Sequence, residues 1–217
     1  MSTGKNMTTI NPTEAFNKGI REYLKLDVYR ELMDAVDSVN LADASDSTEF
    51  RRLYNGYYRI RRDKAWQDKY YSLFEEAKGM EDQLSFDDIL FTLYKETGQV
   101  EKVFVSKMIA TLNPDKPILD SRVISYLNKT GNHIGYSGRI IESKYSRYED
   151  DVTEADKKRL EPAIREYQDL EIWYEEYVGS DECWEVVKNF DTTFPEFKDS
   201  KHFTTVRKID WYLWLLG

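Results

Sequence analysis

The stretch TGQVEKVFVSKMIATLNPDKPILDSRV, residues 97–123, decides the fold class. Gly98 suits the left-handed C-cap of a helix, and the apolar spacing after it predicts a second helix that ends at Asn113-Pro114. A loop bounded by prolines then leads to Asp120, a residue type that caps helices by accepting backbone amide bonds. The stretch therefore predicts a helix, a glycine turn, an apolar helix, a loop and a further helix.

The same apolar spacing continues in both directions along the chain, and no alternating pattern of a strand appears. Helices are predicted at residues 13–24, 27–39, 48–62, 65–79, 85–98, 100–114, 120–131, 139–150, 153–179, 181–191 and 204–217. We therefore expect an all-α fold, with a flexible N-terminal tail over 1–12 and a compact multi-helix domain over 13–217. A division into two helical lobes is the other arrangement that the pattern allows.

The composition excludes several classes of site. Cys183 is the single cysteine, so no internal disulfide or all-cysteine metal cluster can form, and a structural role in a helix is expected for it. His133 and His202 are too few and too scattered for a histidine zinc site. Neither a Walker-type phosphate loop nor a GxGxxG or GxSxG motif occurs, so we predict no cofactor and no metal.

No hydrophobic segment predicts a membrane location. The first residues are polar and lack the apolar core of a signal peptide. The longest apolar run, WYLWLL near the C-terminus, is far below the roughly 20 residues that span a bilayer. We therefore expect a cytoplasmic protein without a membrane partner.

Charge is unevenly distributed along the chain. The formal net charge is −9, which argues against indiscriminate nucleic-acid binding. Residues 51–64 carry six basic side chains against one acidic one, whereas residues 149–185 carry fourteen acidic against four basic ones. The acidic segment is either an ordinary solvated helical face or one of two oppositely charged faces.

The opening stretch also holds two residues that can carry chemistry, Lys102 and Asp120, which are 18 residues apart. A helix, a glycine hairpin, a lysine, an apolar helix and then PILD before a helix resemble the helix-hairpin-helix DNA glycosylases, the superfamily of endonuclease III and 8-oxoguanine glycosylase. The stretch is also similar to small uncharacterised bacterial proteins with a comparable SK…NP…P…D pattern. The resemblance covers about 30 residues, from Leu93 to Val123.

The resemblance implies a base-excision site in double-stranded DNA with a modified or missing base. Asp120 falls on the catalytic aspartate, which stabilises positive charge on the sugar, and Lys102 falls on the amine nucleophile. The turn at Gly98 falls where the family binds a DNA phosphate. This chain departs from the family at Val100, which replaces the second hairpin glycine, and it lacks the iron–sulfur cysteines of some members.

Structural roles compete with these assignments. Asp120 serves equally as a helix N-cap, and Lys102 as a solvated first-turn lysine. Lys107 is a rival for the amine role, and it lies roughly 140° around the helix from Lys102, so that both cannot face one pocket. It sits on an apolar side of the helix, where a half-buried lysine is expected to pair with a carboxylate, either structurally or functionally.

A row of basic residues gives the remaining candidate DNA contacts. Arg51, Asn55, Arg59 and Arg62 are spaced by four, four and three residues, and so form one stripe on the helix predicted over 48–62. Such a stripe suits phosphates, or alternatively salt bridges to the acidic segment 149–185. Together with Gly98, Lys107 and Arg122, these residues complete the predicted DNA-binding set.

Three functional hypotheses follow. The chain is a DNA glycosylase-like enzyme, a nucleic-acid-binding module that keeps the fold without the chemistry, or a helical protein that binds other proteins. Burial of Arg51, Arg59 and Arg62 against carboxylates would favour the third hypothesis. The acidic balance and Val100 favour the second.

Overall fold

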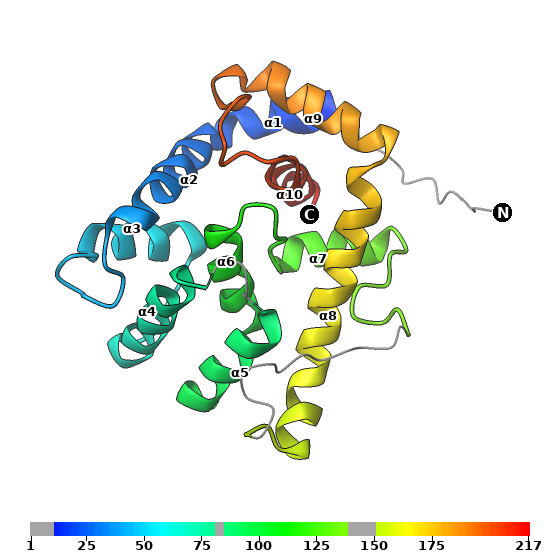
Figure 1. Cartoon of the computed structure of the whole chain (residues 1–217). Helices are drawn as coiled ribbons and strands as arrows, with labels where there is room; N and C mark the ends of the chain where they lie inside the picture. Colours follow the sequence, from blue (N-terminus) through cyan, green and yellow to red (C-terminus); the bar gives the residue numbers. More distant parts are fainter. Residues whose placement is uncertain (1–10, 81–84, 139–150) are drawn as a thin grey trace. The chain divides into compact units, whose positions relative to one another are not determined.

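The computed structural model describes residues 11–80, 85–138 and 151–217 (Figure 1). These residues form α-helices and short 3₁₀ helices without a strand, which confirms the all-α prediction. The tail predicted over 1–12, apart from its last two residues, and the helix predicted over 139–150 lie outside the described residues. The chain divides into two compact units, which were one of the two arrangements considered.

Unit 1 comprises Met1–Arg21, Pro114–Ile140 and Arg165–Gly217, and unit 2 comprises Glu22–Asn113 and Ile141–Ile164. The helices of unit 1 are α1 (Pro12–Gly19), α7 (Ser121–Lys129), α9 (Asp181–Thr193), η4 (Pro195–Phe197) and α10 (Thr205–Leu216). The helices of unit 2 are α2 (Tyr23–Ala35), η2 (Val36–Ser38), α3 (Thr48–Tyr58), α4 (Lys64–Lys78), α5 (Phe86–Thr97) and α6 (Lys102–Leu112). Two helices contribute residues to both units, η1 (Ile20–Glu22) and α8 (Glu154–Val178).

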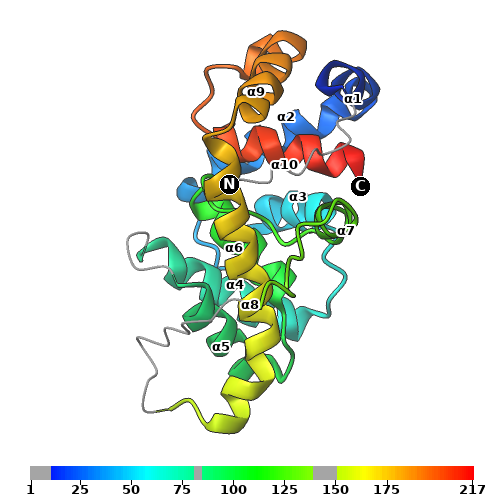
Figure 2. The ribbon, with the colours of Figure 1, turned by 90° about the vertical axis from the view of Figure 1, so that its right-hand side faces the viewer.

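Helix α10 is central to unit 1, because it packs against α1, α7 and α9 (Figure 2). The aromatic core beside it contains Phe16 of α1 and Phe190 of α9, whose rings meet edge to face with centroids 5.7 Å apart. Gly19 allows α1 to approach closely, since a Cβ there would lie 2.6 Å from a methyl group of Leu215. The helix predicted over 204–217 is therefore confirmed, and it contributes to the core of unit 1.

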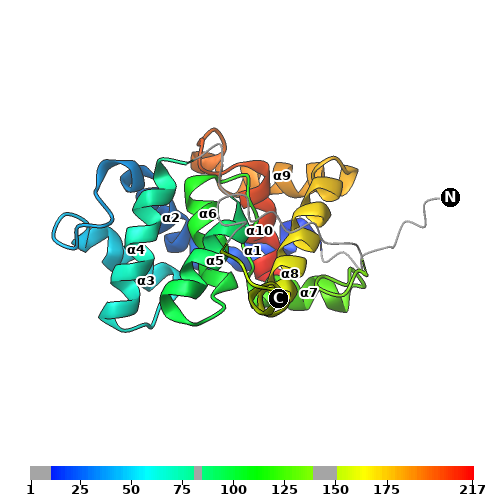
Figure 3. The same cartoon turned by 60° about the horizontal axis from the view of Figure 1, so that its bottom comes forward.

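Unit 2 is built from neighbouring helix pairs, α2 with α3, α4 with α5 and α5 with α6 (Figure 3). Its core is rich in tyrosine, and the hydroxyl groups of two of these residues are hydrogen-bonded within it. Tyr70 donates a hydrogen bond of 2.9 Å to the carbonyl of Phe104, and the hydroxyl groups of Tyr54 and Tyr70 are 2.9 Å apart. These bonds pair the polar ends of two large buried rings within the core.

The prediction of a helix through Arg62 is wrong. Helix α3 ends at Tyr58, and Arg59 adopts the left-handed conformation with φ 55°. The amide of Ile60 then bonds back to the carbonyl of Asn55 at 2.9 Å, and the Ile60 side chain is buried. Burial of Ile60 opposes a straight continuation of the helix, so Arg59 and Arg62 leave the stripe predicted with Arg51 and Asn55.

This helix end has a consequence for stability that can be measured. Arg59→Gly should stabilise unit 2 by up to about 1 kcal/mol, because glycine adopts the left-handed conformation without a steric cost. Arg52→Gly, in the middle of α3, should destabilise it by about 1 kcal/mol. Urea unfolding measures both changes. Destabilisation by both substitutions would show that the helix continues past Tyr58.

Candidate functional site around Asp120

Asp120 is the N-cap of α7, as the sequence predicted. Its Oδ1 accepts a hydrogen bond of 2.8 Å from the amide of Arg122, and its backbone is extended with φ −97° and ψ 133°. The side chain is only partly buried. The cap fixes one carboxylate oxygen, and the helix N-terminus provides a favourable place for its negative charge.

The residues that lead to Asp120 are held by α10 through alternate backbone groups. Arg207 Nε donates to the carbonyl of Pro114 at 3.0 Å, and the same guanidinium donates to the carbonyl of Lys116. The carboxylate of Asp210 accepts the amide of Ile118. The amide of Asp120 in turn bonds to the carbonyl of Ile118 at 2.8 Å. A continuous set of hydrogen bonds thus runs from α10 to the backbone of Asp120.

Arg207 and Asp210 are themselves paired and nearly buried. Arg207 Nη1 lies 2.8 Å from Asp210 Oδ2, and the hydroxyl of Tyr174 on α8 donates to Asp210 Oδ1. Burial raises the pKa of the Asp210 carboxyl and the negative charge of Asp120 adds to the rise, whereas Arg207, Tyr174 and the Ile118 amide oppose it. Asp120 and Asp210 are therefore electrostatically coupled within unit 1.

Two further contacts support this part of unit 1. Lys116 forms an ion pair of 2.9 Å with Glu171 on α8. The guanidinium of the exposed Arg122 lies 4.6 Å from the centre of the Trp214 ring. Arg122 therefore remains at the surface beside Asp120, where it was predicted as a DNA contact.

The sequence did not identify Arg207, Asp210 and Tyr174 as site residues. The apolar and aromatic sequence of the last helix predicts that Asp210 and Lys208 lie at its edge. The structure instead buries Lys208 in an ion pair of 2.6 Å with Asp191, separate from the contacts of Asp210. The available signal was an Arg–Asp pair at positions i and i+3 in an otherwise apolar helix, a spacing that places both side chains on one face.

Lys102 and the glycine turn lie in unit 2, whereas Asp120 lies in unit 1. Gly98 caps α5 with φ 70°, which confirms the predicted left-handed C-cap. Glu101 is the N-cap residue of α6 and is buried, with its carboxylate 2.6 Å from Arg62. Lys102 is the first residue of α6 and is partly exposed. The structure thus places the predicted turn and lysine together, at the start of one helix.

Lys107 is buried in unit 2, and its position explains a lysine within an apolar helix. Its Nζ donates a hydrogen bond of 3.1 Å to the carbonyl of Tyr58, the last residue of α3. The same ammonium lies 5.2 Å from the Tyr58 ring and 5.4 Å from the Phe104 ring. The last carbonyls of a helix lack helical partners, so Lys107 satisfies one of them and adds cation–π contacts.

The predicted arginine stripe is divided between internal and exposed roles. Arg51 is buried, pairs with Asp68 at 3.1 Å and donates to the carbonyl of Leu41 at 2.6 Å. The Asn55 side chain bonds to Gln67 and accepts the hydroxyl of Tyr71. Arg62 pairs with Glu101, as described above, and Arg59 is exposed. The carboxylates that pair with Arg51 and Arg62 therefore come from 68 and 101 rather than from 149–185.

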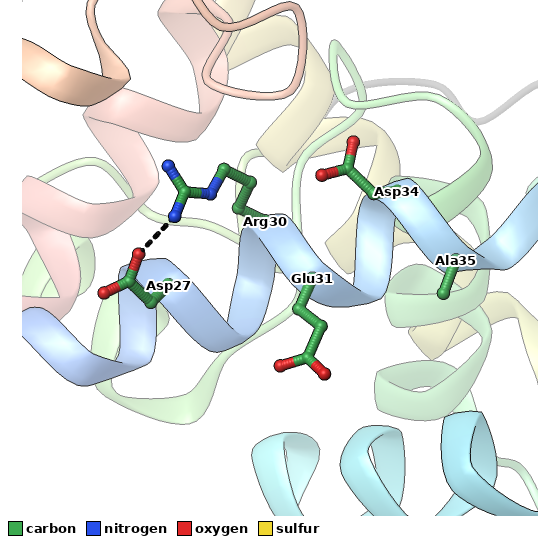
Figure 4. Close-up of a pocket in the computed structure, with 5 residues that line it drawn as sticks. All are labelled: Asp27, Arg30, Glu31, Asp34 and Ala35. Carbon is green, nitrogen blue, oxygen red and sulfur yellow. Dashed lines mark hydrogen bonds and ion pairs between the residues drawn. The ribbon is translucent and has the colours of Figure 1, made fainter.

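A shallow surface hollow lies on α2 but carries no sign of a binding site (Figure 4). It is lined by Asp27, Arg30, Glu31, Asp34 and Ala35. Arg30 pairs with Asp27 at 2.7 Å, and Figure 4 shows Glu31 and Asp34 pointing away from each other. The acidic groups therefore do not converge on one ligand, and none of the predicted site residues lines the hollow.

Metal and thiol chemistry find no support in the part of the chain that the structure describes. There, no group of three His, Cys, Asp or Glu side chains is arranged to hold a metal ion. Cys183 is buried in α9, and burial raises the pKa of its thiol, so the reactive thiolate is disfavoured.

Within the described ranges, no helix combines the length and the apolar character required to cross a bilayer.

Comparison with known proteins adds no relative. No protein-family model matches the chain, and searches of curated proteins and of solved structures find no match.

The coupling between Asp120 and Asp210 can be measured by titration. We expect the Asp210 carboxyl to titrate above its ordinary pKa of 3.8, and Asp120→Asn to lower that pKa because it removes a neighbouring negative charge. Carboxyl-carbon NMR provides the measurement. A pKa of Asp210 that is unchanged by Asp120→Asn would show that the two carboxylates are not coupled.

The raised pKa of Asp210 also predicts how the stability of the protein changes with pH. Because the folded pKa lies above the unfolded one, the folded chain keeps a proton that the unfolded chain has released, and stability falls as pH rises from 3.8 through the raised pKa. The free energy of unfolding of the unaltered chain, relative to that of Asp210→Asn, should decrease over this window.

Proposed function

We propose that the protein is a DNA glycosylase-like enzyme that recognises and releases a damaged or modified base, with Asp120 stabilising the positive charge on the sugar. The observation that carries this proposal is a partly exposed carboxylate at a helix N-terminus, whose approaching backbone is fixed by buried hydrogen bonds. A preorganised charge costs little rearrangement when the opposite charge develops in the transition state. The resemblance of residues 93–123 to the helix-hairpin-helix glycosylases supports the same role.

The chemistry assigns a separate part to each residue. Cleavage of the N-glycosidic bond moves electrons toward the departing base and leaves positive charge on the sugar, which a carboxylate stabilises. Lys102, at the start of α6, is the proposed amine for attack at C1′ and Schiff-base formation. Arg122 and Arg59, both exposed, are the proposed phosphate contacts that remain from the predicted set. Arg51 and Arg62 have structural partners instead.

The alternative is a helical module that binds nucleic acid or protein without catalysis. Its protein-binding form is favoured by the internal pairing of Arg51 and Arg62, which removes two cations from the predicted DNA-binding set. A duplex with a stable abasic-site analogue tests recognition without a choice of base. Tighter binding to this duplex than to the intact one, at low and at moderate salt, is expected for the enzyme, and binding to neither indicates a protein partner.

Asp120→Asn separates the catalytic role from the structural one. Asparagine caps helices as well as aspartate does, so the free energy of unfolding should change by less than about 0.5 kcal/mol. Release of free base from duplexes with deaminated, oxidised or alkylated bases should fall by about 100-fold or more. Asp115→Asn is the matched control, because this exposed aspartate lies in the same segment. Unchanged release by Asp120→Asn would contradict the role of Asp120.

Borohydride trapping tests the amine. With a duplex that contains a natural abasic site, the unaltered chain should form a covalent complex that gel electrophoresis detects, and Lys102→Gln should abolish it. Lys107→Met, which keeps an apolar stem in the core, should retain trapping. Loss of the complex only in the Lys107 variant would assign the amine to Lys107.

A further inference from the structure

We propose that Asp210 is a positioning residue for Asp120, acting with Arg207 and Tyr174 through the backbone of residues 114–118. This inference rests on the proposed function of Asp120. It assigns a role in that function to the C-terminal helix, outside the stretch that resembles the glycosylases.

The first step is the match between two side chains and the backbone of the segment that leads to Asp120. Arg207, a cation with several donors, binds the carbonyl groups of Pro114 and Lys116. Asp210, an acceptor, binds the amide of Ile118. Thr204 also donates to the carbonyl of Pro114 at 2.8 Å. Donors meet carbonyls and the acceptor meets the amide, so the polar groups of α10 and of this segment are complementary in type.

The second step is the energetic cost of this arrangement. Burying an ion pair removes both charges from water, and well-packed apolar residues are often as stabilising. Asp210 pairs with Arg207 and also accepts a hydrogen bond from Tyr174 on α8. What an apolar contact cannot supply is a fixed backbone register, which the amide and carbonyl contacts provide.

The third step connects that register to the carboxylate. The carbonyl of Ile118, whose amide bonds to Asp210, accepts the amide of Asp120. Movement of Ile118 therefore moves the Asp120 backbone and the cap at the start of α7. A displacement of about 1 Å at a reacting group is enough to lower a rate by about 100-fold.

The test uses a matched pair of substitutions on two buried ion pairs of α10. Asp210→Asn alters the carboxylate that holds Ile118, and Asp191→Asn alters the carboxylate of α9 that pairs with Lys208. With the duplex whose base the unaltered chain releases, Asp210→Asn should lower the single-turnover rate by about 10-fold or more. Asp191→Asn should change it by less than about twofold.

Affinity for the abasic-analogue duplex distinguishes a positioning role from a general loss of structure, because a general loss of structure would weaken binding as well as the rate. We expect Asp210→Asn to keep this affinity within about threefold, because the positioning role affects the reacting carboxylate rather than the phosphate contacts. Tyr174→Phe is the second variant if Asp210→Asn does not fold. It removes one hydroxyl from a buried ring and should lower the single-turnover rate by about threefold to tenfold at unchanged affinity.

Each outcome distinguishes the two proposals. Equal rates for Asp210→Asn and Asp191→Asn, or for Tyr174→Phe and the unaltered chain, would overturn the positioning role while the proposed function stands. A parallel loss of rate and affinity in Asp210→Asn would also overturn it, in favour of a purely structural role. Absence of base release by the unaltered chain would overturn the proposed function, and the positioning role with it.

Discussion

The hydrogen bonds between α10 and residues 114–118 are the constraint on which the candidate site depends. Arg207 pairs with Asp210, and both contact the backbone that leads to Asp120, so a buried ion pair and a loop conformation are fixed together. Neither can change without leaving polar groups unpaired in a buried place. The backbone that carries Asp120 is therefore held by the packed core of unit 1, although the Asp120 side chain is partly exposed.

In unit 2, charged side chains likewise bond to backbone groups or pair with each other at the ends of helices. The side chain of Lys107, in the apolar helix α6, donates to the last carbonyl of α3. Arg62 pairs with Glu101 at the start of α6. The guanidinium of Arg62 also lies 5.7 Å from the rings of Trp66 and Phe104. These charged residues stabilise helix termini and turns. A basic residue count therefore overstates the number of cations that unit 2 offers to a nucleic acid.

The sequence predicted the features that local rules control. The helical class, the cap at Gly98, the N-cap at Asp120 and the end of α6 at Asn113 all follow from turn and capping residues, and the structure confirms them. The end of α3 was missed because Arg59 is an unusual residue in a left-handed conformation, and burial of Ile60 decides the turn. Arg207 and Asp210 were missed because their partners are about 90 residues away in the chain, beyond the reach of periodicity.

Amide hydrogen exchange of the unaltered protein tests the central claim most directly, since it reports on the backbone of residues 114–120 without a substrate. If α10 holds this segment, the amides of Ile118 and Asp120 should exchange at least about 100-fold more slowly than those of an unstructured chain. Their protection should also be lost together with that of α10 in mild denaturant. Exchange of Ile118 and Asp120 at the rate of an unstructured chain, while α10 stays protected, would contradict the account.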